Sequence, residues 1–483
     1  MTVAFVPVYI KYLGIENYGL IGLFSVLQAF LSLLDLGLKP ALGREMARYA
    51  GGASDDQSIW NLLRSIELLS AVGVFSVASI IWAASGWLAT DWVRAQGLPG
   101  NAVAQAFSVM GVVACLQFLE SIYASSLAGL QRQALQNILM SITATVRGVG
   151  AVGVLVYIAP STQYFFLWQG ICSVGSLILL RAVVYKLLPV PINPPRFSKA
   201  ALLTIWRFAA GMLSITLLAL LLTQIDKILL SRLLSLENFG YYVLAGLVAG
   251  SLGVLVGPIS AAFYPKFVEL LVRHDETALR LAYHQGAQLV TVIVGSATLV
   301  LIVFRKEVLF LWTSDIELTQ HVAPLMCILA LGTFFNCLMW IPYQLQLAAG
   351  WTSLTISMNA IAVVLFAPLT LWLVPKYGAM SAAWIWVAIN WTYCVIGVQF
   401  MFRRMLTTEK WIWYFTDVLI PFSAAGAITI LARQVFPLQL TRISASLWLG
   451  FTAFAVLLAS AVAAPLLRRH LLRYLPRVRR FFV

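Results

Sequence analysis

The residues of this sequence that could do chemistry are the few charged side chains that lie inside long apolar runs. Arg147 is the clearest case: it stands in the small-residue segment 141–150, about 12 residues, or roughly 18 Å at 1.5 Å per residue, into an apolar stretch. An arginine at this depth cannot readily extend to a membrane surface. Charge inside a membrane is costly and is by default a functional candidate. Two roles stay open for Arg147: a cation that faces a cavity, or the structural partner of a carboxylate.

Four more charged residues lie within apolar runs. Asp35 and Glu120 fall in the same half of the chain as Arg147, where a carboxylate could bind a coupling Na⁺ or H⁺ or could neutralise the arginine. Asp226 and Lys227 are adjacent, so in a helix their side chains point about 100° apart and need not pair with each other. We interpret these two residues as parts of a gate or of a contact between lobes.

A basic edge follows the first long apolar run. Lys39, Arg44 and Arg48 stand there within one short segment. Arginine forks match phosphate oxygens, so this edge could be the first contact of an anionic cargo. The alternative is a signal that retains this end of the run in the cytoplasm. Further along, Arg64 and Glu67 are expected to pair, because they are one helical turn apart.

The chain that positions these side chains has the composition of an integral membrane protein. Its 483 residues are 61% hydrophobic and 10% charged, with 32 Lys and Arg against 18 Asp and Glu. Soluble domains carry about a quarter charged residues. The formal net charge of +14 is therefore attributed to a membrane, and no nucleic-acid partner is expected.

Cysteine, histidine and glycine motifs point to no metal, redox or nucleotide chemistry. The five Cys lie in apolar runs and never at CxxC spacing, and the four His form no HExxH pair. The sequence has no GxxxxGK[ST] motif for ATP. No catalytic residue, metal site or cofactor is expected, apart from a coupling Na⁺ or H⁺, and the chain is not expected to be an enzyme.

Thirteen apolar stretches are long enough to cross a bilayer, which takes about 20 residues. They are preceded by 1–13, which is apolar but too short for a hydrocarbon core of about 30 Å and is interpreted as the stub of a first helix. With the stub as span 1, spans 2 to 14 are expected at 18–38, 59–87, 102–130, 135–158, 164–188, 202–229, 239–263, 287–304, 322–349, 354–373, 379–402, 413–435 and 446–467.

The distribution of basic residues predicts the orientation of these spans. Basic residues near span ends are retained on the cytoplasmic side. The connections after even-numbered spans, together with the C-terminal tail, hold 22 of the 32 Lys and Arg, and those after odd-numbered spans hold nine. Both termini are thus expected in the cytoplasm. The basic tail 468–483 could be held against an anionic leaflet, or it could be a topology signal only.

An internal repeat predicts two lobes. The segment 13–20 (LGIENYGL) matches 234–241 (LSLENFGY) at an offset of 221, and two further landmarks recur at this offset to within one residue. We expect an all-α polytopic membrane protein with two six-helix lobes, related by a pseudo-two-fold axis along the membrane normal, and two added C-terminal helices. Such lobes can rock about a central cavity to give alternating access. The parts are expected at 1–200 and 201–406 for the lobes, 407–467 for the added helices and 468–483 for the tail.

The same offset indicates a deficit at the N-terminus. Met1 aligns with Leu222, so the first helix lacks the counterpart of 202–221. We favour a start codon assigned too far downstream over a functional half-helix.

The motifs resemble those of a known family. Four segments near the N-terminus resemble the opening of the Wzx-type polysaccharide (O-antigen) flippases, which belong to the multidrug/oligosaccharidyl-lipid/polysaccharide (MOP) exporter superfamily. These segments are 7–14 (PVYIKYLG), 16–19 (ENYG), 33–38 (LLDLGL) and 44–49 (REMARY). Similar to second-lobe landmarks of the group are 223–230 (TQIDKILL) and 374–379 (VPKYGA). The resemblance implies a bilobed bundle that moves an undecaprenyl-pyrophosphate-linked oligosaccharide from the cytoplasmic to the outer leaflet of a bacterial inner membrane.

This cargo gives the basic residues their expected roles. Arg147 would meet the pyrophosphate or acidic sugars inside the bundle, and Lys39, Arg44 and Arg48 would contact the pyrophosphate first. The expected partners are this cargo, the bilayer and, as a further option, other polysaccharide assembly proteins.

Two alternative functions stay open. A cation-coupled multidrug exporter of the same fold should need an acidic cavity rather than a basic one. A membrane-embedded glycan polymerase or transferase usually carries a large outward loop with catalytic carboxylates or histidines, whereas the longest outward connections here are only 87–101 and 305–321.

Overall fold

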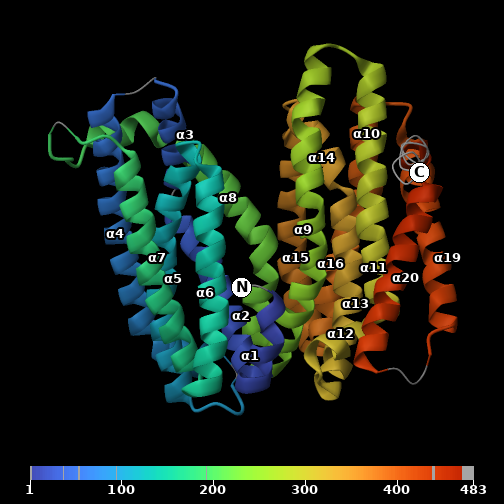
Figure 1. The fold of residues 1–483 in the computed structure, drawn as a ribbon, viewed down its shortest axis with the longest axis horizontal. Helices are drawn as coiled ribbons and strands as arrows, with labels where there is room; N and C mark the ends of the chain where they lie inside the picture. The colour runs from blue at the N-terminus through green and yellow to red at the C-terminus, as the bar shows by residue number, and fades with distance from the viewer. Residues whose placement is uncertain are drawn as a thin grey trace, which may run out of the picture. The chain divides into compact units, whose positions relative to one another are not determined.

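The computed structural model of the protein describes residues 3–35, 37–52, 55–93, 95–191, 193–437 and 441–469, and every element within these ranges is helical (Figure 1). The expected all-α fold is therefore confirmed. The chain divides into two compact units, Met1–Gly240 and Tyr241–Val483. We call them unit 1 and unit 2 and describe each by itself.

Unit 1 is built around α5 (Gly100–Gly129). Of the most apolar 18-residue stretch of each helix, 50% is buried inside the protein in α5, compared with 17% in α4 and 22% in α6. α5 packs on α2, α3, α4 and α7, so it is the central helix of the unit. The other helices are α1 (Val6–Leu13), α2 (Ile15–Leu31), α3 (Leu38–Ala50), α4 (Asp56–Trp87), α6 (Gln133–Tyr157), α7 (Thr162–Leu187) and α8 (Lys199–Leu233).

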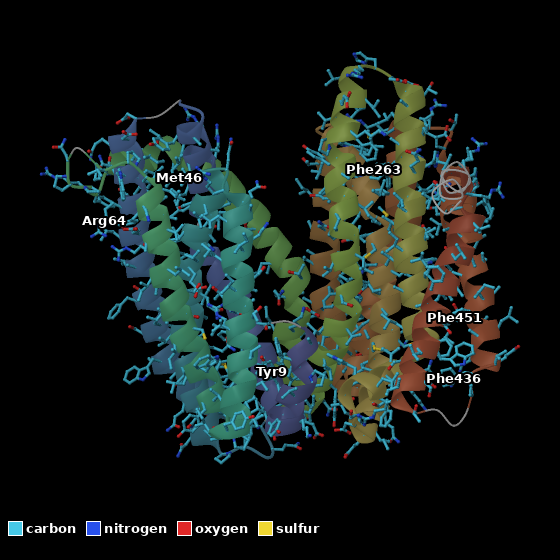
Figure 2. The ribbon with its side chains drawn as sticks, viewed as in Figure 1. Tyr9, Met46, Arg64, Phe263, Phe436 and Phe451 are labelled. Atoms are coloured by element: carbon cyan, nitrogen blue, oxygen red, sulfur yellow. The ribbon has the colours of Figure 1, made fainter. Side chains whose placement is uncertain are left out.

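Unit 2 contains a helix pair, α19 (Ile420–Gln434) and α20 (Arg442–Ala463), that packs on α11 (Ser296–Val303). Buried Val300, Phe304 and Val456 lie in the apolar cluster that joins the three helices. Figure 2 labels Phe451, on α20, and Phe436, just beyond α19; the ring centre of Trp448 on α20 lies 6.0 Å from that of Phe436 and 6.4 Å from that of Phe451. The remaining elements are α9 (Leu236–Val272), which starts in unit 1, α10 (Glu276–Val290), α12 (Arg305–Thr313), α13 (Ile316–Leu338), α14 (Trp340–Ala348), α15 (Ser353–Tyr377), α16 (Ala379–Thr392), α17 (Val398–Arg404) and α18 (Lys410–Ile412), with π turns η4 (Thr291–Gly295), η5 (Tyr393–Gly397) and η6 (Trp413–Leu419).

Polar caps set where many of these helices begin. A side-chain oxygen of the residue before the first turn accepts from a backbone N–H of that turn, which would otherwise lack a partner. Such caps are made by Asp55, Ser161, Ser198, Asp275, Asp315 and Thr441.

Each predicted span coincides with a helix. Within the described ranges, eleven helices are long and apolar enough to cross a membrane. Two predicted spans are not among these eleven helices: 18–38 overlaps α2, a shorter apolar helix, and 202–229 lies within α8. The number of crossings stays a prediction.

The first of these spans is not continuous, contrary to the expectation for 18–38. α2 ends at Leu31, and a 3-10 turn, Ser32–Asp35, precedes α3. Gly37 lies between them with a φ of +74°, and a Cβ at this position would stand 2.0 Å from the backbone oxygen of Ala209 in α8. The break therefore requires glycine, both for its left-handed backbone and for the close approach of α8.

The two copies of the repeated motif contact each other within unit 1. A Cβ on Gly19 would lie 2.6 Å from the backbone oxygen of Leu236, and a Cβ on Gly240 would lie 2.5 Å from that of Ile15. The offset of 221 pairs Ile15 with Leu236 and Gly19 with Gly240, so the contact is reciprocal. Equivalent segments that meet in this way are related by a local two-fold axis.

The expected boundary between lobes, 200/201, stays a prediction. The compact units divide 40 residues later, at Gly240 and Tyr241, because α8 packs on α2, α3 and α4 of unit 1. Of the expected basic tail, 468–483, only Arg468 and Arg469 lie among the described residues.

Candidate functional site

Arg147 forms an ion pair with Glu120 in the interior of unit 1. Arg147 Nη2, on α6, lies 2.5 Å from Glu120 Oε1 on α5 and donates to Ser173 Oγ on α7 at 3.0 Å. The Glu120 side chain is 5% exposed and that of Arg147 is 19% exposed. Arg147 Nε is buried and has no hydrogen-bond partner among the described residues. The carboxylate partner considered for Arg147 is thus present, and the guanidinium keeps both an accessible edge and an unused donor.

Asp35 and Lys39 lie together at the break between α2 and α3. Asp35 Oδ1 accepts from the backbone N–H of Lys39 at 2.6 Å, so this carboxylate caps the start of α3. The Lys39 ammonium lies 4.4 Å from the ring centre of Phe118 on α5. Ser125 Oγ donates to the Lys39 backbone oxygen at 2.7 Å. Lys39 is therefore directed towards the central helix.

Arg44 and Arg48 are exposed on α3. Arg48 Nη1 lies 3.3 Å from Glu45 Oε2 in the same helix. Figure 2 places Met46, on α3, and Arg64 towards one end of unit 1 and Tyr9 towards the other. The expected binding arginines therefore lie in two places: Arg147 is in the interior of unit 1, and Arg44 and Arg48 are at one end of it.

Asp226 and Lys227 form a local pair on α8. Lys227 Nζ lies 3.4 Å from Asp226 Oδ1 and donates to the backbone oxygen of Thr223 at 2.8 Å. We expected that these two side chains need not pair with each other, and the structure shows that they do pair. Their role as gate residues stays a prediction.

Glu67 is the centre of a second cluster in unit 1. It forms the expected pair with Arg64, whose Nη1 lies 3.1 Å from Glu67 Oε2. The hydroxyls of Tyr123 on α5 and Tyr185 on α7 donate to Glu67 Oε1 at 2.8 and 2.7 Å. The tyrosines were not singled out in the sequence, because a phenol in an apolar run is most often an interfacial anchor. The cluster joins α4, α5 and α7.

Sequence reasoning missed a charged cluster in unit 2. His284 on α10 lies between two carboxylates: its Nδ1 faces Asp417 on η6, and its Nε2 is 3.2 Å from Glu409 Oε2. Asp417 is fully buried. More than 120 residues separate His284 from either carboxylate, so no local pattern marks the cluster. The available signal was Asp417 itself, a carboxylate inside the predicted span 413–435.

An apolar groove of about 1080 Å³ runs between α15 and α16. Its lining extends from Leu354 to Tyr377 along α15, about 23 residues or roughly 34 Å, which matches a hydrocarbon core of about 30 Å. At one end, the Arg403 guanidinium lies 5.9 Å from the ring centre of Phe400, which lines the groove. At the other end, the Lys376 ammonium lies 4.7 Å from the ring centre of Trp372, which does not line the groove.

The sequence matches the model of a family described as polysaccharide biosynthesis protein over residues 1–271. A Shigella flexneri protein named "Putative O-antigen transporter" is 19% identical over 399 residues, which cover 82% of this chain and 92% of that protein.

Two solved structures share the fold. An inward-facing multidrug resistance MATE family transporter of the MOP superfamily superposes with a TM-score of 0.67 at 14% identity, over 84% of this chain and 94% of that one. The lipid II flippase MurJ, in an inward closed conformation, superposes with a TM-score of 0.63 at 11% identity, over 93% of this chain and 96% of that one. The fold is therefore of the MATE and MurJ type.

Proposed function

Because the chain belongs to the polysaccharide biosynthesis protein family, we propose that it flips an undecaprenyl-pyrophosphate-linked oligosaccharide from the cytoplasmic to the outer leaflet of a bacterial inner membrane, by alternating access. The O-antigen transporter relative and the flippase fold support a lipid-linked cargo. The chain is a membrane transporter of the O-antigen flippase type and not an enzyme.

The observation that carries the proposal is the Arg147–Glu120 pair among apolar helices. A buried ion pair is weak support for stability, because desolvation of two charges offsets most of their attraction. A guanidinium has five N–H donors, and Nη2 supplies both of the Arg147 hydrogen bonds described above. Arg147 can therefore bind a pyrophosphate oxygen, which would compete with Glu120 for the same cation.

This competition suggests how a coupling ion could act. When the anionic cargo binds Arg147, Glu120 loses its counter-charge, and a buried carboxylate without a counter-charge takes up a proton or a cation. Glu120 is thus our proposed site for a coupling H⁺ or Na⁺. Asp35 is less suited, because one of its oxygens already caps α3.

The groove between α15 and α16 supports a cargo with a lipid tail. It runs the thickness of a hydrocarbon core, and Arg403 lies beside the end that is cytoplasmic in the predicted topology. A tail in this groove would keep an anionic head group near this cation on the cytoplasmic side.

Arg147→Ala tests the proposal. Expressed in a strain that lacks its own O-antigen flippase, together with the matching glycan genes, this variant should reach the membrane at the wild-type level and lose surface glycan by tenfold or more, since a cavity cation is gone. Surface glycan is measured by immunoblot and protein level by an epitope tag. Arg273→Ala, which removes an exposed arginine paired with Glu269 at 2.8 Å outside the proposed site, is the matched control and should retain most of the glycan.

Wild-type surface glycan in Arg147→Ala would contradict the assignment of this residue. The drug susceptibility of a deletion strain separates the alternative function: increased susceptibility together with intact surface glycan would identify a multidrug exporter instead.

A further inference from the structure

Three side chains of unit 2 form a closed acid–histidine–acid arrangement. His284 Nδ1 hydrogen-bonds to Asp417 Oδ2, and His284 Nε2 lies 3.2 Å from Glu409 Oε2. The exposed fractions are 7% for His284, 0% for Asp417 and 7% for Glu409. Water therefore has little access to any of the three groups. We call this set the triad.

The outer oxygens of the two carboxyl groups also have N–H partners. Asp417 Oδ1 accepts from Gln288 Nε2 at 2.9 Å, and Glu409 Oε1 is 3.2 Å from Arg280 Nη1. An N–H donor on the outer oxygen favours the ionised form of each carboxyl group. With both carboxylates ionised, both ring nitrogens must donate, and since a neutral imidazole has only one N–H donor, the ring is then an imidazolium with two.

With both carboxylates ionised, the imidazolium and Arg280 carry two positive charges opposite the two negative charges of Glu409 and Asp417. Without the ring proton, a buried site would keep one uncompensated negative charge, and a lone pair of the ring would face a carboxylate. The other titratable groups that interact with the site are Tyr283 on α10, Tyr414 on η6, Cys394 on η5 and the exposed Glu276, which pairs with Arg280.

The triad lies where the two C-terminal helices join the rest of unit 2. Glu409 directly precedes α18, and Asp417 belongs to the π turn that leads into α19. The amide of Gln288 donates to Asp417 and accepts, through Oε1, from the backbone N–H of Leu466 at 3.0 Å, just beyond α20. Hydrogen bonds from α10 thus reach the segment that leads into α19 and the segment that follows α20.

We propose that the Glu409–His284–Asp417 triad is a proton-binding site that fastens the two C-terminal helices, α19 and α20, to α10. With the proton bound, both carboxylates are held by N–H donors of one ring. When the proton leaves, one of the two hydrogen bonds is lost and the segment 409–419 separates more readily from α10. The inference rests on the geometry of the triad and is independent of the proposed cargo.

Histidine NMR tests proton binding directly. The full chain, labelled with ¹⁵N-histidine and placed in lipid nanodiscs, has only four histidines, and His284→Gln identifies the His284 signal. We expect the His284 ring to carry both protons at about pH 8, where an unperturbed histidine with a pKa of about 6.5 is neutral. A His284 ring with a single proton at about pH 7 would overturn the proposal, whatever the protein transports.

Hydrogen exchange tests the fastening. In His284→Gln, amides of 409–419 should exchange about tenfold faster than in the wild type at neutral pH, because their attachment to α10 is weakened. Asp417→Asn, which keeps the shape of the side chain, should give the same direction. His321→Gln removes an exposed histidine of the same unit and should leave the segment unchanged. Equal exchange in the wild type and both triad variants would show that the triad does not fasten this segment.

Discussion

At the scale of single residues, the Arg147–Glu120 pair could serve the stability of unit 1 or its transport function. The two roles differ in what simultaneous replacement does. Removal of one partner leaves an uncompensated buried charge, whereas replacement of both by apolar residues of similar volume often leaves stability unchanged. The pair is therefore suited to a comparison of single and double variants.

Glu120→Met should lower the free energy of unfolding by about 3 kcal/mol, since Arg147 is left without its anion. The double variant Arg147→Met with Glu120→Met should return close to the wild-type unfolding temperature and still lack flipping activity. Thermal unfolding in detergent and surface glycan in cells measure the two effects. A double variant with restored transport would show that the pair is structural only.

The sequence was sufficient to find Arg147 and Glu120, because each charge stands well inside an apolar run, whereas Asp417 lies only four residues into its predicted span. It was not sufficient to show that they pair, since they lie 27 residues apart on two helices. The triad was missed for a related reason: His284 and Glu409 stand at the ends of predicted spans, where polar residues are ordinary. Their proximity depends on how the C-terminal helices pack.

At the scale of elements, the hydrophobic runs predicted the helices well and their interruptions poorly. Every span coincides with a helix, because burial in a bilayer requires long apolar segments with satisfied backbone groups. The break at 32–37 is not visible in hydropathy, since its residues are mostly apolar. It depends on the approach of α8 to Gly37, which is a tertiary contact.

Gly37→Ala should destabilise unit 1 strongly. The new methyl group would meet the backbone of Ala209, which cannot move aside as a flexible side chain can. Gly52 offers a matched control, because its φ is +78° and nothing lies within 4 Å of its Cβ position. Gly52→Ala should cost only about 1 kcal/mol, the price of a left-handed backbone for alanine. Unfolding temperatures that fall equally in both variants would contradict the importance of the α8 contact.

At the scale of the whole molecule, composition predicted an integral membrane protein, and the motif resemblance predicted a polysaccharide flippase. The family match confirms a polysaccharide biosynthesis protein, and the fold is of the MATE and MurJ type. The sugar composition of the proposed cargo has no comparable signature in the sequence. Recognition of a glycan depends on the positions of a few polar groups, and these positions follow from helix packing rather than from the residue pattern.

The predicted sidedness can be tested with single cysteines in a chain whose five native cysteines are replaced. A cysteine at Ala159, after span 5, should react with a membrane-impermeant maleimide added to intact cells with a permeabilised outer membrane. One at Asn193, after span 6, should react only in inverted vesicles, because the basic residues around it retain this connection in the cytoplasm. The reverse pattern would invert the whole topology.

The reciprocal approach of Gly19 and Gly240 has a consequence for how this chain can change over evolution. Each glycine faces a backbone oxygen of the other copy, at 2.6 and 2.5 Å from where a Cβ would stand. This is the geometry of an interface between identical subunits, in which one substitution acts twice. Within a fused chain the two positions mutate separately, yet a larger residue on either side meets the same obstacle. This crossing point therefore holds both glycines under one steric constraint, whatever substitutions the two segments carry elsewhere.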